Sequence, residues 1–163
     1  MKIVKILFSS ITMFLLIVGM GCEKENNKKL ILPMDDVSNQ INSFFETNLP
    51  TIAESECFFK SKNGDVYYLI NNKNELSDIF LCNSSLPDIN FSECSLIIGQ
   101  KNFTSSFYKV IEQNITESDK WLDLNIYVRL LSDTSWPSFS KMYYWGVYPK
   151  LSSKKINVNV TIK

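Results

Sequence analysis

The 163-residue chain contains no histidine, so it lacks the commonest general base and the commonest metal ligand in proteins. Catalysis by Ser-His-Asp or Cys-His arrangements is therefore excluded. The five glycines are too few and too scattered for a phosphate-binding loop. Cys57, Cys82 and Cys94 do not have the spacing of a thiolate zinc site. We expect a protein that is not an enzyme and that carries no metal or cofactor.

The chain also lacks an excess of basic charge. Its 17 basic and 17 acidic residues give a formal net charge of zero. Nucleic-acid-binding domains need a clustered basic face. We therefore expect no nucleic-acid partner.

A long apolar run occurs at the start of the chain, but it is too short to span a membrane. Lys2 and Lys5 precede the uncharged segment from Ile6 to Gly21, whereas a spanning helix needs about 20 apolar residues. A positive start, a short apolar run and small residues at its end are the layout of a secretory signal peptide. We expect residues 1–21 to be removed.

The sequence "VGMGC" at the end of this run resembles a bacterial lipobox, in which Cys22 receives a diacylglycerol and cleavage occurs just before it. Gly21 fits the small residue required there, and Gly19 stands where the usual box has leucine. Such looser boxes resemble lipoproteins of the Bacteroidota, and "CEKEN" resembles their export signal for the outer surface. The resemblance implies a lipid anchor in the outer membrane at Cys22, with residues 22–30 as a flexible tether. Ordinary cleavage, which leaves Cys22 a free thiol, is the alternative.

With Cys22 lipidated, three cysteines remain in an oxidising compartment, so at most one intramolecular disulfide can form. Cys82 and Cys94 are nearest in sequence and bracket the loop-like segment "NSSLPDINFSE". We favour this pair. Pairing of Cys57 with either partner, and the absence of a disulfide, remain open.

Helical spacing of apolar residues predicts a helix within residues 34–50, capped by Asp35 or Asp36 and stopped by Pro50. A short helix is predicted after Asn72 or Asn74. Between them, "ECFFK" and "DVYYLI" flank Asn63-Gly64, a strong signal for a hairpin turn.

The second half of the chain has the period of strands. "CSLIIGQ" (94–100) is typical of a strand buried on both faces, and "SSFYKVIEQNI" and "WLDLNIYVRLL" flank a polar turn as a hairpin. In residues 121–131 the apolar side chains alternate with Asp123, Asn125 and Arg129. We predict an α+β domain over residues 31–163. Its twisted antiparallel sheet has six to seven strands and is either open or curled towards a barrel, with an N-terminal helix and a short middle helix.

Several segments together resemble small lipoproteins of unknown function of the Bacteroidota: "NNKNELSDIF", "LPDINFSECSLIIGQ", "FYKVIEQ", "YYWGVYPKL" and "INVNVTIK". More distantly, Glu54 to Lys163 is similar to the protease-complex accessory domain, which is named for stabilising a surface protease. Asn90 stands where that domain has aspartate, and "TSSFY" where it has a Gly-Gly-Tyr hairpin. The resemblance implies a non-catalytic, protein-binding module.

The binding candidates are aromatic: Trp136, Tyr143, Trp145 and Tyr148. Tyr143 and Trp145 share one side of a predicted strand and Tyr148 lies on the other, so one set faces outward if the sheet has a solvent face. Exposed Trp and Tyr anchor protein interfaces and stack on sugars. The alternative is that one set fills the core and the other packs under the loop "SDTSWPSFS".

Two functions follow. The first is a lipid-tethered protein-binding domain that inhibits or stabilises a protease, and the second is a surface carbohydrate-binding module. A flat row of exposed rings favours a glycan, whereas a mixed patch with aliphatic side chains favours a protein.

Overall fold

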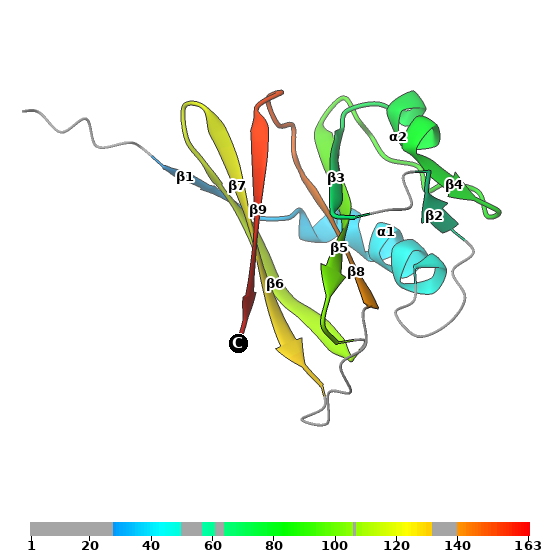
Figure 1. Cartoon of the computed structure of the whole chain (residues 1–163). Coiled ribbons are helices and arrows are strands. Elements are labelled where there is room, and N and C mark those ends of the chain that lie inside the picture. The colour runs from blue at the N-terminus through cyan, green and yellow to red at the C-terminus, as the bar shows by residue number, and fades with distance from the viewer. Residues whose placement is uncertain (1–27, 50–56, 61–63, 106, 132–139) are drawn as a thin grey trace, which may run out of the picture.

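The structure is a computed structural model that describes residues 28–49, 57–60, 64–105, 107–131 and 140–163 (Figure 1). Within these ranges the chain forms nine strands and two helices. In chain order they are β1 (Lys29–Ile31), α1 (Asp35–Asn48), β2 (Cys57–Phe59), β3 (Val66–Ile70), α2 (Lys73–Ile79), β4 (Phe80–Cys82), β5 (Cys94–Phe103), β6 (Tyr108–Glu117), β7 (Trp121–Leu130), β8 (Ser140–Pro149) and β9 (Lys155–Ile162).

The described strands form three open sheets rather than the single sheet of six to seven strands that the sequence predicted. The outer sheet has the order β1-β6-β7-β9, the middle sheet β3-β5-β8, and the small sheet β2-β4. Neighbouring strands are antiparallel except β7 and β9, which are parallel because the chain visits the middle sheet as β8 before it returns. The mixture of helices with mainly antiparallel strands is as expected.

The three sheets and the helices stack as layers (Figure 1). One hydrophobic core fills the space between the outer and middle sheets. A second core lies on the other face of the middle sheet, where α1, α2 and the small sheet cover it. The middle sheet is therefore enclosed on both sides, whereas the outer sheet has one face without a covering layer among the described residues.

Strand β5 shows this enclosure directly. Every residue from Cys94 to Gln100 is buried, which confirms the prediction from its continuous apolar run. Ile97 belongs to the first core, and Leu96 and Ile98 belong to the second. Successive side chains of a strand point to opposite faces, so both faces of the sheet must be dry here.

Strands β6 and β7 form the predicted hairpin, with Asn114 opposite Asn125 and a register shift between Val110 and Glu112. Two polar contacts join β6 to the backbone of β8. The amide of Gln113 donates to the carbonyl oxygen of Trp145, and the N–H of Tyr143 donates to the hydroxyl of Tyr108 at 3.0 Å. Burial raises the pKa of Tyr108 to about 12, so this hydroxyl stays neutral.

The hairpin predicted around Asn63-Gly64 is wrong as a pairing. Gly64 does have a positive φ of 80°, which glycine adopts without strain. However, β2 pairs with β4, and β3 pairs with β5. The positive φ of Gly64 agrees with the turn signal, and Asn63 lies outside the described residues. Tertiary contacts decided the partners of each strand.

The helices lie close to their predicted places. Helix α1 begins at Asp35 with Met34 as its N-cap residue, so neither Asp35 nor Asp36 is the cap. Helix α2 is capped as predicted, because the Asn72 side chain accepts the N–H of Glu75 at 2.9 Å.

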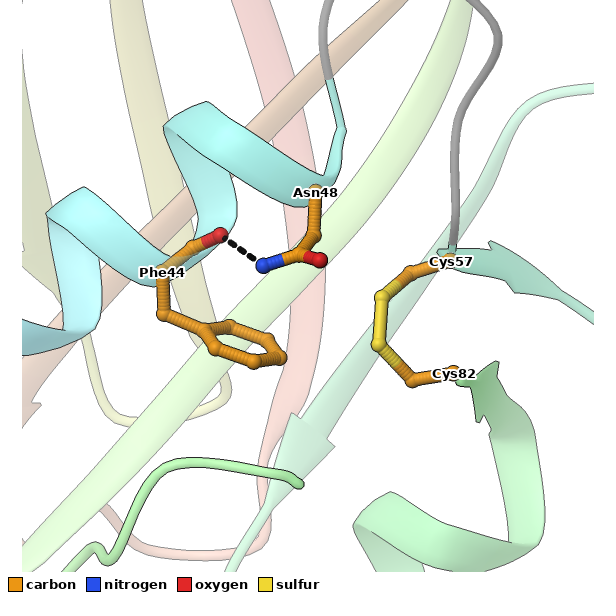
Figure 2. Close-up of a disulfide and its surroundings, with 4 residues drawn as sticks. All are labelled: Phe44, Asn48, Cys57 and Cys82. Atoms are coloured by element: carbon orange, nitrogen blue, oxygen red, sulfur yellow. Dashed lines mark hydrogen bonds between the residues drawn. A yellow bond between two sulfur atoms is a disulfide. The ribbon is translucent and has the colours of Figure 1, made fainter. Parts of the chain in front are cut away.

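The disulfide joins Cys57 to Cys82, so the favoured pairing of Cys82 with Cys94 is wrong. Cys57 and Cys82 are directly opposite each other in the small sheet, with Cα atoms 4.1 Å apart. Cys94 starts a strand of the middle sheet, where its buried thiol donates to the carbonyl of Asn90 at 3.0 Å. Figure 2 shows the disulfide beside the last turn of α1. Sheet pairing, rather than nearness in sequence, selects the partner.

Candidate functional site

The aromatic residues predicted as binding candidates do not form an exposed row. Trp136 lies outside the described residues. On β8, the indole N–H of Trp145 donates to the Asn42 side chain of α1 at 2.9 Å, and the ring lies 5.5 Å from that of Phe45. The ring of Tyr143 stacks against that of Phe59 in the small sheet, with centroids 6.3 Å apart.

Tyr148 points to the opposite side of β8 and is fully buried in the first core. Within the described structure, the middle sheet therefore offers no row of rings to solvent. Tyr148 fills the core, as the alternative interpretation expected of one set. Tyr143 and Trp145 pack against the small sheet and α1, and the loop expected to cover them lies mostly outside the described residues.

The uncovered face of the outer sheet carries the most organised polar surface of the described chain. We call this surface the polar face and define it by the outward side chains of β6, β7 and β9. Strand register arranges most of these side chains in rows of three across the sheet. The rows are Thr116–Asp123–Asn157, Asn114–Asn125–Asn159 and Glu112–Tyr127–Thr161, with Trp121 beside Lys155 at one end and Lys109 beside Arg129 at the other.

Hydrogen bonds hold the amides of the polar face in fixed orientations. The side-chain N–H of Asn125 donates to Asn114 at 3.1 Å, and Asn159 donates to Asn125 at 3.2 Å. In the next row Asn157 donates to the carboxylate of Asp123 at 2.8 Å. The donors of Asn125 are already used by Asn114, Thr116 and the carbonyl of Asp123. Asn157 and Asn159 are exposed and each keep a second side-chain N–H for a ligand.

Two aromatic rings flank the amides on β7. Trp121 is 39% exposed, and the ammonium of Lys155 lies 5.5 Å from its ring centroid. Tyr127 is half-buried, and the ammonium of Lys163 lies 3.7 Å above its ring. The two rings are six residues apart along one strand, which corresponds to about 20 Å. Cation–π contacts at exposed sites contribute only about 0.5–1 kcal/mol, so a ligand could displace either lysine.

A cleft of about 520 Å³ adjoins the polar face where β9 of the outer sheet faces β3 of the middle sheet. Asp123, Asn157 and Asn159 belong to both surfaces. The remaining lining residues are Asp65, Tyr67, Gln100, Lys101, Tyr144, Ile156 and Val158. The polar face and the cleft are therefore continuous around the edge strand β9.

Gly99 allows Tyr144 to reach the cleft. A Cβ atom at residue 99 would overlap the ring and hydroxyl of Tyr144 and lie 2.7 Å from the carbonyl oxygen of Val66. Because Gly99 has no side chain, the phenol of Tyr144 can lie over β5 at this position. Burial, and then the negative charge of Asp65, raise the pKa of Tyr144 well above its usual value. The hydroxyl is a neutral hydrogen-bonding group at physiological pH.

Two of the three charged groups of the cleft are paired with each other, and the third, Asp123, accepts a hydrogen bond from Asn157. Lys101 contacts the carboxylate of Asp65 at 2.7 Å, and the backbone N–H of Asn102 donates to the same carboxylate at 2.7 Å. The Lys101 hydrogen bond, followed by that from Asn102, lowers the pKa of Asp65. The cleft therefore offers a neutral phenol, an ion pair, a carboxylate and amides as hydrogen-bonding groups.

The described residues contain no group of three or more histidine, cysteine, aspartate or glutamate side chains able to hold a metal ion. No helix within these same ranges is both long and apolar enough to cross a bilayer. Cys22, the predicted lipidation site, lies outside the described residues.

Sequence reasoning missed Trp121 and Tyr127 as candidates, although the signal was present. The period-two pattern of β7 separated Asp123, Asn125 and Arg129 from the apolar face. Trp121 and Tyr127 have the same parity as these residues and therefore point the same way. The sequence-based prediction chose β8 because aromatic residues are densest there, and it did not use the alternation of side chains along β7.

No family model, curated protein or solved structure matches this chain.

Proposed function

We propose that this is a lipid-anchored protein of the bacterial cell envelope whose non-catalytic domain binds carbohydrate on the polar face. The observation that carries the proposal is the ordered array of amides on β6, β7 and β9, flanked along β7 by Trp121 and Tyr127.

The chemistry of the array suits sugar hydroxyls. Each hydroxyl both donates and accepts hydrogen bonds, and a side-chain amide offers both functions within one planar group. Aromatic rings supply apolar area with a preferred stacking face. The hydrogen bonds that link Asn114, Asn125 and Asn159 orient these groups before a ligand arrives, which lowers the entropy cost of binding.

The anchor part of the proposal rests on the amino-terminal segment. Lys2 and Lys5, the apolar run and the Gly21-Cys22 junction support lipidation at Cys22. Two or more acyl chains would hold the protein firmly on a bilayer. Since β1 begins at Lys29, the connection from Cys22 spans at most about 24 Å. The domain would therefore work close to the membrane surface.

Mass spectrometry of the mature amino terminus tests the anchor. We expect an acylated Cys22, and we expect Cys22→Ala to release the protein from membranes. An unmodified amino terminus elsewhere in the chain would contradict this part of the proposal.

A glycan array probed with the soluble domain tests the binding function. We expect Trp121→Ala to weaken binding of any retained glycan by about 2 kcal/mol. Phe58→Ala is the matched control, because Phe58 is 41% exposed and lies on the small sheet, in a different layer. Loss of binding in Phe58→Ala but not in Trp121→Ala would contradict the use of the polar face.

Protein binding is the second candidate. Phe58 and Leu81 are each 41% exposed and lie opposite each other in the small sheet. Such a mixed aromatic and aliphatic pair favours a protein partner, including a protease that the domain inhibits or stabilises. Retention of an envelope protein that Phe58→Ala abolishes and Trp121→Ala preserves would support this function over glycan binding.

A further inference from the structure

One end of the polar face is basic. Lys109 on β6 lies directly opposite Arg129 on β7. The backbone N–H of Lys163 donates to the carbonyl of Val128 at 2.9 Å, which continues β9 alongside β7 to the same level. We call Lys109, Arg129 and Lys163 the basic row.

Only one member of the basic row forms an ion pair with an acidic side chain of the described chain. The ammonium of Lys163 lies 3.0 Å from the carboxylate of Glu112. Lys109 and Arg129 are exposed, and no acidic side chain within the described ranges forms an ion pair with either of them. Like charges directly opposite each other in an antiparallel pair destabilise the sheet. An anion bound between them would remove this repulsion.

The rest of the polar face limits which anion fits. Asp123 lies two rows away from Tyr127 on β7, and Glu112 adjoins Tyr127. These carboxylates would repel a ligand with a charge at every step, such as DNA, which has one negative charge per about 1.7 Å of helix axis. A ligand with widely spaced charges avoids them, because it can place neutral hydroxyls over the amides.

We propose that the glycan bound by this domain is an acidic polysaccharide, with a carboxylate or sulfate of one sugar bound at Lys109 and Arg129. This inference rests on the proposed carbohydrate-binding function and specifies its ligand class. Neighbouring outward positions along β7 are separated by about 6.7 Å. The anionic sugar therefore lies at the Arg129 end, and neutral sugars of the same chain lie over Tyr127 and Asn125.

The guanidinium of Arg129 is the main determinant of the anion in this arrangement. Its planar array of donors matches a carboxylate or a sulfate oxygen pair, whereas Lys109 supplies a mobile point charge. Lys163 can leave Glu112 for the ligand, because an exposed ion pair contributes no more than about 1 kcal/mol.

Matched ligands that differ only in charge provide the first test. Sparsely de-esterified pectin, in which most sugars stay neutral, is compared with fully methyl-esterified pectin, and sparsely sulfated dextran with dextran. Binding is measured by affinity electrophoresis or calorimetry on the soluble domain. In at least one pair, we expect the charged glycan to bind at least tenfold more tightly than the uncharged one. Added salt should weaken the binding of the charged glycan. The pair that shows the difference identifies carboxylate or sulfate as the anion.

Matched variants provide the second test. Arg129→Gln should weaken binding of the charged glycan about tenfold or more and leave the uncharged form unchanged. Lys73→Gln is the control, because Lys73 is an exposed lysine on α2, in another layer. Trp121→Ala should weaken binding of both the charged and the uncharged glycan, because the Trp121 ring stacks on a sugar and does not contact the anionic group.

The outcomes separate the two proposals. Equal binding of charged and uncharged glycans, with loss in Trp121→Ala, overturns the acidic ligand and retains the carbohydrate-binding function. Binding of no glycan overturns both. Binding of the sulfated dextran and of DNA alike, unaffected by Trp121→Ala, would identify non-specific polyanion attraction and would also overturn the acidic-polysaccharide proposal.

Discussion

The outer and middle sheets each contain a pair of long strands of the same length, yet they have opposite surroundings. Strands β5 and β8 of the middle sheet and β6 and β7 of the outer sheet each have ten residues. The middle sheet is covered on both faces, so the aromatic side chains of β8 become part of the interior. The outer sheet is covered on one face, so the aromatics of β7 reach solvent. The number of covering layers, rather than the density of rings, decides which residues can meet a ligand.

Exchanging one tryptophan in each sheet is the strongest test of this comparison. Trp145→Ala removes a ring packed against Phe45 and hydrogen-bonded to Asn42, and should cost about 3–5 kcal/mol of unfolding free energy. Trp121→Ala should cost less than about 1 kcal/mol, because its ring lies on the surface. Urea unfolding of both variants measures the difference. Equal losses would mean that the two sheets are not distinguished by burial.

Removal of the disulfide tests the layer that covers the middle sheet. Cys57 and Cys82 are 25 residues apart, and opening a loop of that size should lower stability by about 3 kcal/mol. We expect Cys57→Ser/Cys82→Ser to reduce the melting temperature, and non-reducing peptide mapping to link these two cysteines. Cys94 should react with an alkylating reagent only after unfolding, because it is buried. A map that links Cys94 to either partner would contradict the structure.

The Tyr144 ring lies directly over Gly99, and a substitution at Gly99 tests how tightly the middle sheet is packed beside the cleft. Gly99→Ala places a methyl group that overlaps the Tyr144 hydroxyl. We therefore expect overpacking to lower the free energy of unfolding by about 1–3 kcal/mol. Gly64→Asn is the control, because no heavy atom lies within 4 Å of an added Cβ there and asparagine tolerates positive φ. A smaller loss in Gly99→Ala than in the control would mean that Tyr144 can move aside.

The smallest effect concerns pH at the edge between the two sheets. The hydrogen bond from Lys101, and then that from Asn102, lower the pKa of Asp65 below its ordinary value of 3.8. A lowered pKa stabilises the folded state above the ordinary value, and this contribution is lost as the pH falls through the folded pKa. Because Asp65 is largely exposed, the contribution is below about 1 kcal/mol. Unfolding of Asp65→Asn and the unchanged protein should therefore differ at neutral pH and converge in acid. A difference that persists at about pH 2 would contradict this account.

Local patterns of the sequence predicted most individual elements. The β6–β7 hairpin, the doubly buried β5 and the Asn72 cap of α2 depend on residues close together in the chain, and all three are confirmed. The failures concern partners that are distant in sequence. The pairing of Cys57 with Cys82, and of β3 with β5, is decided by which layer each strand joins, and no local period encodes that choice.

The candidate site was partly predictable for the same reason. The alternation along β7 was recognised, and it already placed Asn125 and Arg129 on the face away from the core. The arrangement of Asn159 beside Asn125 was not predictable, because it requires the parallel return of β9 to β7. A row of side chains across three strands becomes visible only when the sheet order is known.

The parallel pairing of β9 with β7 determines when the polar face forms during folding. The chain completes β6 and β7 as a local hairpin, then crosses to the other sheet as β8 and returns with β9. Contacts that are so distant in sequence form late and slowly during folding. The hairpin alone therefore presents two columns of side chains, and the third is added only after both sheets have docked. Ligand binding would therefore require that β9 has paired with β7. A bound ligand would in turn protect the edge strand β9 from local unfolding.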